Sequence, residues 1–178
     1  MDSINHNQAE LNREDLSGSV AVKKLRDLVK SADTCFFCTA AATGPSSGTR
    51  PMSVRLADEA GVLWFLSASD SHKNKEIELN PNVDLYFQGS AHSEFLHLSG
   101  TAVISRDPEK IKELWSPILK TWFTEGTDDP RITVIAVSPQ TGYYWGTKHG
   151  KAVAGIKMLI GAATGKTLDD SIEGTLSP

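Results

Sequence analysis

The stretch SASDSHKNKEIELNP, residues 67–81, places cationic side chains at the start of a short predicted helix. A helix N-terminus already carries partial positive charge and normally prefers Asp or Glu in its first turn, yet this one has His72, Lys73 and Lys75. Free backbone N–H groups, the hydroxyl of Ser71, an imidazole and an ammonium group would together suit a phosphate or another anion. The sequence therefore indicates a candidate anion site.

A plainer explanation of the same charges is a solvated helix. Lys73 would then pair with Glu76, and Lys75 would pair with Glu78, each pair contributing about 0.2–0.5 kcal/mol. Asp70 or Ser71 could cap the helix, but Lys73 and Asn74, and not Glu or Gln, stand three residues after them. A capping box therefore does not account for the pattern. From the local sequence alone, this plainer explanation is favoured.

The segment GTRPMSVRL, residues 48–56, is a predicted strand with an arginine on each face. Pro51 cannot donate a hydrogen bond to a neighbouring strand, so this part of the backbone should face a sheet edge or a ligand. Backbone groups along such an edge could bind the rim of a planar heterocycle, although from this segment alone an ordinary amphipathic strand with surface arginines is the favoured explanation. The two faces carry Thr49, Pro51, Ser53 and Arg55 on one side and Arg50, Met52, Val54 and Leu56 on the other.

A third candidate is the aromatic cluster in TGYYWG, residues 141–146, at the end of a predicted strand. Clusters of this kind usually cover a core or an oligomer interface, where Tyr and Trp are enriched. An exposed indole could also stack on a flat ring. The sequence leaves both uses open.

The cysteines and histidines do not predict a redox or metal site. Cys35 and Cys38 form a C-x-x-C pattern inside an apolar, β-prone run, where residues three apart point to opposite faces. No second cysteine pair is present to complete a closed zinc site, so we expect two buried cysteines. The histidines at 6, 72, 92, 97 and 149 show no metal-ligand spacing, and no nucleophile elbow, P-loop or H-E-x-x-H motif occurs.

Composition is typical of one soluble globular domain. The chain has 178 residues and a net charge of −4, which argues against a broadly basic nucleic-acid-binding surface. The N-terminus has no apolar signal-like run, and the apolar stretch AVAGIKMLIGAA is short and interrupted by Lys157. We expect a cytoplasmic protein that binds neither nucleic acid nor membrane.

The periodicity predicts short strands interspersed with a few helices. Helices are expected over 20–32, over 74–79, from Asp107-Pro108 to an end before Gly126 with a kink or division at Pro117, and over 149–165. Strands are expected over 34–41, 49–57 and 62–68 as a meander, and then over 82–89, 95–105, 132–139 and 141–146. This order favours a small β-barrel with outer helices over a parallel sheet. We expect a flexible segment 1–18, one domain over 19–165 that includes the C-terminal helix, and a tail over 166–178.

The order of these segments resembles the pyridoxamine 5'-phosphate oxidase-like FMN-binding split-barrel family, in its general stress protein branch. The resemblance spans about residues 20–170 and rests on an R-P-M strand, FLSASDSHK, NPNVDLYF and a later G-T-x-x-x-x-x-D that leads into a helix. Each motif is weak alone, whereas their order and spacing are specific. The resemblance implies an α+β fold, a six-stranded antiparallel split β-barrel with helices packed outside, that forms a homodimer.

The resemblance also implies FMN, with FAD possible, in two clefts between the subunits. The strand from Arg50 through Pro51, Met52, Ser53 and Val54 to Arg55 would meet the pyrimidine edge of the flavin through backbone groups, and Leu66 and Ser67 would lie along the ribityl chain. Ser71, His72 and Lys73 match the Ser-Arg-Lys that holds the flavin phosphate in the oxidase. Trp145 would reach the cofactor from the partner subunit.

The sequence departs from the oxidase at several positions. His72 replaces an arginine and removes a bidentate phosphate contact, Phe95 stands where a flavin-contacting glutamine is expected, and no C-terminal segment matches the one that binds pyridoxal. We therefore expect a flavin-dependent oxidoreductase for an unidentified small molecule, rather than a pyridoxamine-phosphate oxidase. No side chain stands out as a catalytic acid or base. The alternatives are a flavin-binding stress protein without turnover and the same barrel binding deazaflavin F420, with haem ranked last.

Overall fold

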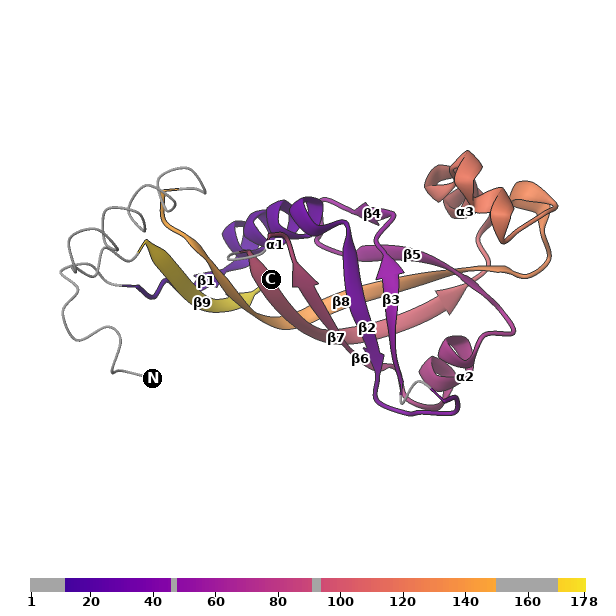
Figure 1. The fold of residues 1–178 in the computed structure, drawn as a ribbon, viewed down its shortest axis with the longest axis horizontal. Coiled ribbons are helices and arrows are strands. Elements are labelled where there is room, and N and C mark those ends of the chain that lie inside the picture. The colour runs from indigo at the N-terminus through magenta and orange to yellow at the C-terminus, as the bar shows by residue number, and fades with distance from the viewer. Residues whose placement is uncertain (1–11, 46–47, 91–93, 150–169) are drawn as a thin grey trace.

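The computed structural model describes residues 12–45, 48–90, 94–149 and 170–178, and these form a mostly antiparallel sheet with helices against it (Figure 1). The strands, in chain order, are β1 (Leu16–Ser17), β2 (Thr34–Thr39), β3 (Thr49–Ser53), β4 (Leu56–Ala57), β5 (Leu63–Ala68), β6 (Asn82–Gln88), β7 (Phe95–Ser105), β8 (Ile132–Thr147) and β9 (Ser171–Ser177). The helices are α1 (Gly18–Ala32), α2 (His72–Leu79) and α3 (Pro108–Leu114), followed by the 3-10 turns η1 (Pro117–Thr121) and η2 (Gly126–Asp128). The predicted α+β class is confirmed.

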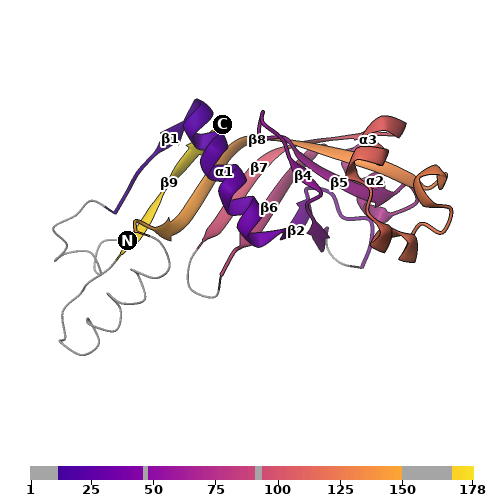
Figure 2. The same cartoon turned by 90° about the horizontal axis from the view of Figure 1, so that it is seen from above.

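The sheet is long and branched at β8. Its main order is β1-β9-β8-β7-β6-β2-β3, and β5, with β4 beside it, pairs with the first half of β8. Both views place β1 and β9 at one end of the molecule and α2 and α3 at the other (Figures 1 and 2). The first residues of β8 therefore lie at one end of the fold, beside β5, and its last residues lie at the other end, beside β9.

The predicted strand 49–57 is broken into β3 and β4, and the break moves the chain from one sheet edge to another. The Val54 N–H donates to Asp33 O beside β2 at 2.9 Å, whereas the next N–H, of Arg55, donates to Trp64 O of β5 at 2.8 Å. The predicted three-stranded meander is therefore wrong in one respect, because β3 pairs with β2 but not with β5. Sequence periodicity could not show this change of partner, since it depends on the tertiary fold.

The two predicted strands 132–139 and 141–146 form one continuous strand, β8. Its register against β7 shifts between Ser99 and Gly100, which lets one strand cover both ends of the sheet. Residues 171–177 form β9 rather than a tail, and β1, from the segment expected to be flexible, pairs with β9 in parallel. Most of the predicted helix over 149–165 lies outside the described residues.

The main core lies between α1 and the inner face of the sheet. The sequence predicts for α1 an apolar stripe of Val22, Leu25, Leu28 and Val29. The helix buries the last three of these together with Ala21, while Val22 is half-buried. A smaller core under α3 is built on Ile111, Leu114, Phe123, Ile132 and Val134. Asp107 caps α3 by accepting from the N–H groups of Glu109 and Lys110, as expected. The chain divides at Pro117, also as expected, but the part after it is the 3-10 turn η1 and not a continued α-helix. No helix within the described ranges is long and apolar enough to cross a membrane.

Candidate functional site

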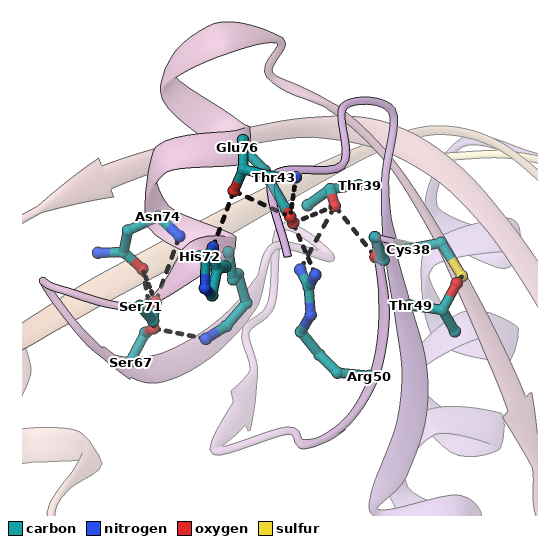
Figure 3. Close-up of polar contacts among 12 residues, drawn as sticks. Cys38, Thr39, Thr43, Thr49, Arg50, Ser67, Ser71, His72, Asn74 and Glu76 are labelled. Atoms are coloured by element: carbon teal, nitrogen blue, oxygen red, sulfur yellow. Dashed lines mark hydrogen bonds and ion pairs between the residues drawn. The ribbon is translucent and has the colours of Figure 1, made fainter. Parts of the chain in front are cut away.

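The start of α2 gathers Ser67, Ser71 and His72, three of the residues that the sequence singled out (Figure 3). Ser71 caps α2, because its Oγ accepts from the N–H of Asn74 at 3.3 Å. Lys73 turns inward and is only 7% exposed, and its Nζ donates to Oγ of Ser67 at 2.6 Å. Ser67, at the end of β5, lies 3.2 Å from the Ser71 hydroxyl. We call Ser67, Ser71, His72 and Lys73 the α2 cluster.

A buried amide that sequence reasoning missed holds this cluster in place. Asn74 accepts from Oγ of Ser67 at 2.8 Å, and its Nδ2 donates to Oγ1 of Thr133 at 2.8 Å. Thr133 in turn donates to the backbone carbonyl of Ser67 at 3.0 Å, which closes the network onto β8. When the single hydrogen of the Ser67 hydroxyl is given to Asn74, its lone pairs face Lys73. The ammonium is thereby fixed in direction.

Glu76, one turn further along α2, pairs with Arg50 of β3 and not with Lys73 (Figure 3). Its carboxylate is fully buried, lies 2.6 Å from the Arg50 guanidinium, and accepts from the Thr39 hydroxyl and the Thr43 N–H at 2.7 Å each. Burial would raise the pKa of Glu76, but the hydrogen bonds from Thr39, Thr43 and Arg50 outweigh it and bring the pKa to about 2. The expected Lys73–Glu76 surface pair is thus wrong, because Glu76 points inward.

His72 lies on the exposed side of the cluster, under the loop that follows β2. Its Nδ1 is 3.1 Å from Oγ1 of Thr43, which also bonds to Glu76. A Cβ added to Gly44 would come within 2.9 Å of the His72 ring, so a side chain at this loop position would displace the imidazole. The same loop therefore positions both His72 and the Arg50–Glu76 pair.

Lys73 is a buried cation without a carboxylate at ion-pair distance among the residues that the structure describes. Burial, together with the nearby charge of Arg50, lowers the pKa of its ammonium to about 8, although Glu76 acts in the opposite direction. A buried charge without a counter-charge is costly, and an anion at this point would remove the cost. The geometry of the α2 cluster therefore fits a phosphate.

Strand β3 is the edge of the sheet and directs part of its backbone away from β2. Val54 N donates to Asp33 O and Thr39 N donates to Gly48 O, so the alternating antiparallel pattern bonds Arg50 and Met52 to β2. The backbone groups of Thr49, Pro51 and Ser53 face the other side. The prediction that Pro51 lies at a sheet edge is confirmed, and this edge begins beside the α2 cluster.

Three other predicted site residues lie elsewhere. Nε of Arg55 donates to Leu114 O at the end of α3, and Leu66 packs with the small core under α3. Thr133 of β8 pairs with Ser67 of β5, and Trp145 follows Thr133 by 12 positions along β8, roughly 40 Å in an extended strand. Trp145 and the α2 cluster of one chain are therefore at opposite ends of the sheet.

The outer face of the sheet carries a row of aromatic rings from neighbouring strands. Phe36 pairs with Tyr86, Tyr86 with His97, and His97 with Tyr143. The Tyr86 and His97 rings stack at 4.5 Å, and Tyr143 lies 4.7 Å from the ring of Trp145. Phe36 is 59% exposed and Tyr86 47% exposed, on the face opposite α1. We call these five residues the outer aromatic face.

The family follows from a match that covers most of the chain. Residues 20–169 match the family described as pyridoxamine 5'-phosphate oxidase like. This chain belongs to that family. The sheet and helices described above are its split-barrel fold, as solved structures confirm.

General stress proteins are prominent among the similar proteins. General stress protein 26 of Bacillus subtilis is 31% identical over 82 residues, which are 44% of this chain and 58% of that protein. A solved structure described as a general stress protein 26 from Jannaschia sp. CCS1 has a TM-score of 0.73 and 23% identity, covering 90% of this chain and 100% of that one. A general stress FMN/FAD binding protein from Xanthomonas citri has a TM-score of 0.57 and 22% identity, covering 67% and 82%. The chain spans 50% to 58% of the curated relatives it matches.

Sequence reasoning thus found the cations and the two serines of the α2 cluster but not the other polar groups that hold them. Asn74, Glu76 and Thr133 were not singled out as site residues, although one signal was present. Helix α2 has few apolar residues, so a helix docked in this fold must bury polar side chains with partners of their own. The cysteine prediction is right for Cys35, which is buried, and wrong for Cys38, which is only half-buried; burial raises the pKa of the Cys35 thiol to about 12. Among the described residues no group of three side chains could hold a metal ion.

Proposed function

We propose that this protein is a homodimeric FMN-binding oxidoreductase that acts on a small molecule. The observation that carries the proposal is the buried ammonium of Lys73, which is fixed by Ser67 at the capped start of α2 and has no carboxylate at ion-pair distance in the described ranges. A phosphate there would receive the charge of Lys73, the Ser71 hydroxyl and the N–H groups of the helix start. His72 would add a second donor.

Arg50 has a different part in this proposal. Its guanidinium is 2.6 Å from the buried Glu76 carboxylate, so its charge is already compensated inside the fold. We therefore assign Arg50 to orienting the first residues of β3 against α2, while Lys73 supplies the net positive charge for the phosphate.

The edge of β3 is the part of the site that would hold the flavin ring. Beyond the α2 cluster, Thr49 and Ser53 direct backbone N–H groups, and Pro51 a carbonyl, away from the sheet. The pyrimidine rim of a flavin offers donors and acceptors in the same plane, which suits such an edge. When bound, the flavin would supply the electron-transfer chemistry, while these residues orient it.

The outer aromatic face supports the homodimer in the proposal. Exposed apolar rings in a contiguous row are characteristic of an interface between chains. Because Trp145 lies at the end of the sheet away from its own α2 cluster, it would approach a flavin only across such a dimer. Trp145 is accordingly assigned to the cofactor of the partner subunit.

The test is a comparison of FMN with riboflavin, which lacks the phosphate. The double variant His72→Ala with Lys73→Ala should bind FMN at least about tenfold more weakly, since a charge-assisted hydrogen bond contributes about 1.5–3 kcal/mol, while riboflavin binding should change little. Lys75→Ala, which removes an exposed cation from the same helix, is the matched control. Fluorescence quenching measures each affinity. Equal losses for both ligands, or no saturable quenching by FMN, would contradict the proposal.

A flavin-binding protein without turnover is the second candidate. It is favoured by the side chains of Thr49, Pro51 and Ser53 at the β3 edge, none of which carries a titratable group for acid or base catalysis. Anaerobic reduction separates the two candidates. Reduction of the bound flavin by NADH or NADPH supports the oxidoreductase, whereas no reduction by either donor supports the binding protein. Titration with FAD and with F420 determines which flavin the site accepts.

A further inference from the structure

A cleft of about 460 Å³ lies between α1 and the chain that follows β3. One wall is the polar side of α1 with its last residues, and the other is the segment Val54–Ala57. Its charged lining consists of four cations, Lys23, Arg26, Lys30 and Arg55, and two acids, Asp27 and Asp33. We call this the α1 cleft, and it is separate from the α2 cluster.

Two of the four cations have partners that the structure shows. Lys23 Nζ lies 2.7 Å from Oδ2 of Asp27, and Nε of Arg55 donates to a backbone carbonyl of α3 at 3.1 Å. Arg26 and Lys30 have no carboxylate within ion-pair distance in the part of the chain described. They are four residues apart on α1, so they project from the same face and repel each other. An anion between them would relieve this repulsion.

The cleft also has an apolar part. Val29 is buried at its base, and Val54 and Leu56 line the opposite wall half-buried. Apolar walls reduce the access of water, and charge–charge attraction is stronger where water is excluded. The lining therefore suits a small molecule with an apolar body and one anionic group.

The position of the cleft relates it to the proposed flavin site. The start of β3 lies beside α2, because Arg50 pairs with Glu76. Its other end leads into the α1 cleft, where Val54 N donates to Asp33 O. From Arg50 to Arg55 an extended chain covers roughly 17 Å. A flavin whose phosphate binds at α2 and whose ring follows the edge of β3 would thus direct its ring toward this cleft.

We propose that the α1 cleft binds the carboxylate or phosphate group of the small molecule that meets the flavin, with Arg26 and Lys30 as the anion-binding residues. The part that concerns the flavin rests on the function proposed above. The anion site itself does not, because its residues lie on α1 and after β3. The inferred substrate is a small molecule with an apolar body and one anionic group.

Benzoate and inorganic phosphate are suitable probes, with benzyl alcohol as the uncharged counterpart of benzoate. Calorimetric titration of the whole protein, with and without FMN, should show saturable benzoate binding and at least about tenfold weaker binding of benzyl alcohol. Arg26→Ala with Lys30→Ala should weaken benzoate binding at least about tenfold. Lys112→Ala with Lys120→Ala, which removes two cations from α3 and η1, should leave it unchanged.

Asp27→Asn provides a second variant, in which Lys23 loses its carboxylate partner and the cleft gains positive charge. Benzoate should bind this variant more tightly than the unaltered protein. Equal benzoate affinities in the unaltered protein and in R26A/K30A would overturn the proposal, as would the absence of saturable binding by both anions. If benzoate binding depends on Arg26 and Lys30 but FMN does not bind, the cleft assignment stands and the flavin function fails. If FMN binds but benzoate binding does not depend on Arg26 and Lys30, the flavin function stands and the cleft assignment fails.

Discussion

Replacing Glu76 with Gln should destabilise the protein strongly at neutral pH and much less in acid. All of the partners of this fully buried carboxylate are donors: the Thr39 hydroxyl, the N–H and hydroxyl of Thr43, and the Arg50 guanidinium. A glutamine offers one acceptor oxygen and turns an NH₂ group toward donors. It also removes the carboxylate that lies 2.6 Å from the Arg50 guanidinium, and only 16% of that arginine side chain is exposed.

Two estimates of the magnitude agree. The pKa of Glu76 falls from its ordinary 4.5 to about 2, and each pKa unit corresponds to about 1.36 kcal/mol, which gives about 3 kcal/mol. Breaking a buried ion pair by removing one partner typically costs about 3–5 kcal/mol. We therefore expect E76Q to lower the free energy of unfolding by about 3 kcal/mol at pH 7.

The direction of the Glu76 pKa shift determines how its contribution to stability changes with pH. Because the folded-state pKa of Glu76 is depressed, its charge stabilises the fold above about pH 4.5, and this contribution is lost as the pH falls toward 2. The difference between the unaltered protein and E76Q should therefore shrink between pH 4.5 and pH 2. Other carboxylates titrate in both proteins and largely cancel from this difference.

Urea unfolding followed by tryptophan fluorescence, at pH 7 and at pH 3, measures the effect. Glu78→Gln, on the same helix but exposed, is the control and should change stability by less than about 0.5 kcal/mol. A double-mutant cycle with Arg50→Gln should show coupling between the two positions. A loss below about 1 kcal/mol at pH 7, or the same loss at both pH values, would refute the reasoning about the buried pair.

Three further predictions concern the cofactor, the interface and the thiols. FMN affinity should fall as the pH rises above about 8, because Lys73 then loses its proton, and fluorescence titration should show a weaker fall in K73A. Phe36→Glu should dissociate the proposed homodimer in light-scattering measurements, whereas Val20→Glu, an exposed apolar position on α1, should not. A thiol reagent should modify Cys38 in the native protein but Cys35 only on unfolding, since burial raises the pKa of the Cys35 thiol to about 12.

Elements governed by local signals could be predicted from the sequence with few errors. Asp107 and Pro108 fixed the start of α3 because a cap and a proline act on the adjacent backbone, and Pro117 ended it for the same reason. The apolar stripe of α1 likewise predicted its buried face. These signals lie within a few residues of the structure that they determine.

Features that depend on distant partners were predicted poorly. The strand 49–57 divides because Val54 and Arg55 bond to different strands, and residues 171–177 become β9 because the far end of β8 offers an edge. The register of a strand with its partner depends on segments that are remote in the sequence, so a local pattern cannot specify it.

The sequence by itself determined which groups could bind an anion: Ser71, His72 and Lys73 stand at a helix start, and the order of segments around them indicated the family. Only the tertiary structure decided which charge remains for a ligand. In the sequence, Glu76 stands three residues after Lys73 and could pair with it, but folding brings Glu76 against Arg50 and leaves Lys73 beside a neutral hydroxyl. The physical reason is burial, because a charge removed from water is compensated by whichever opposite charge the fold places beside it.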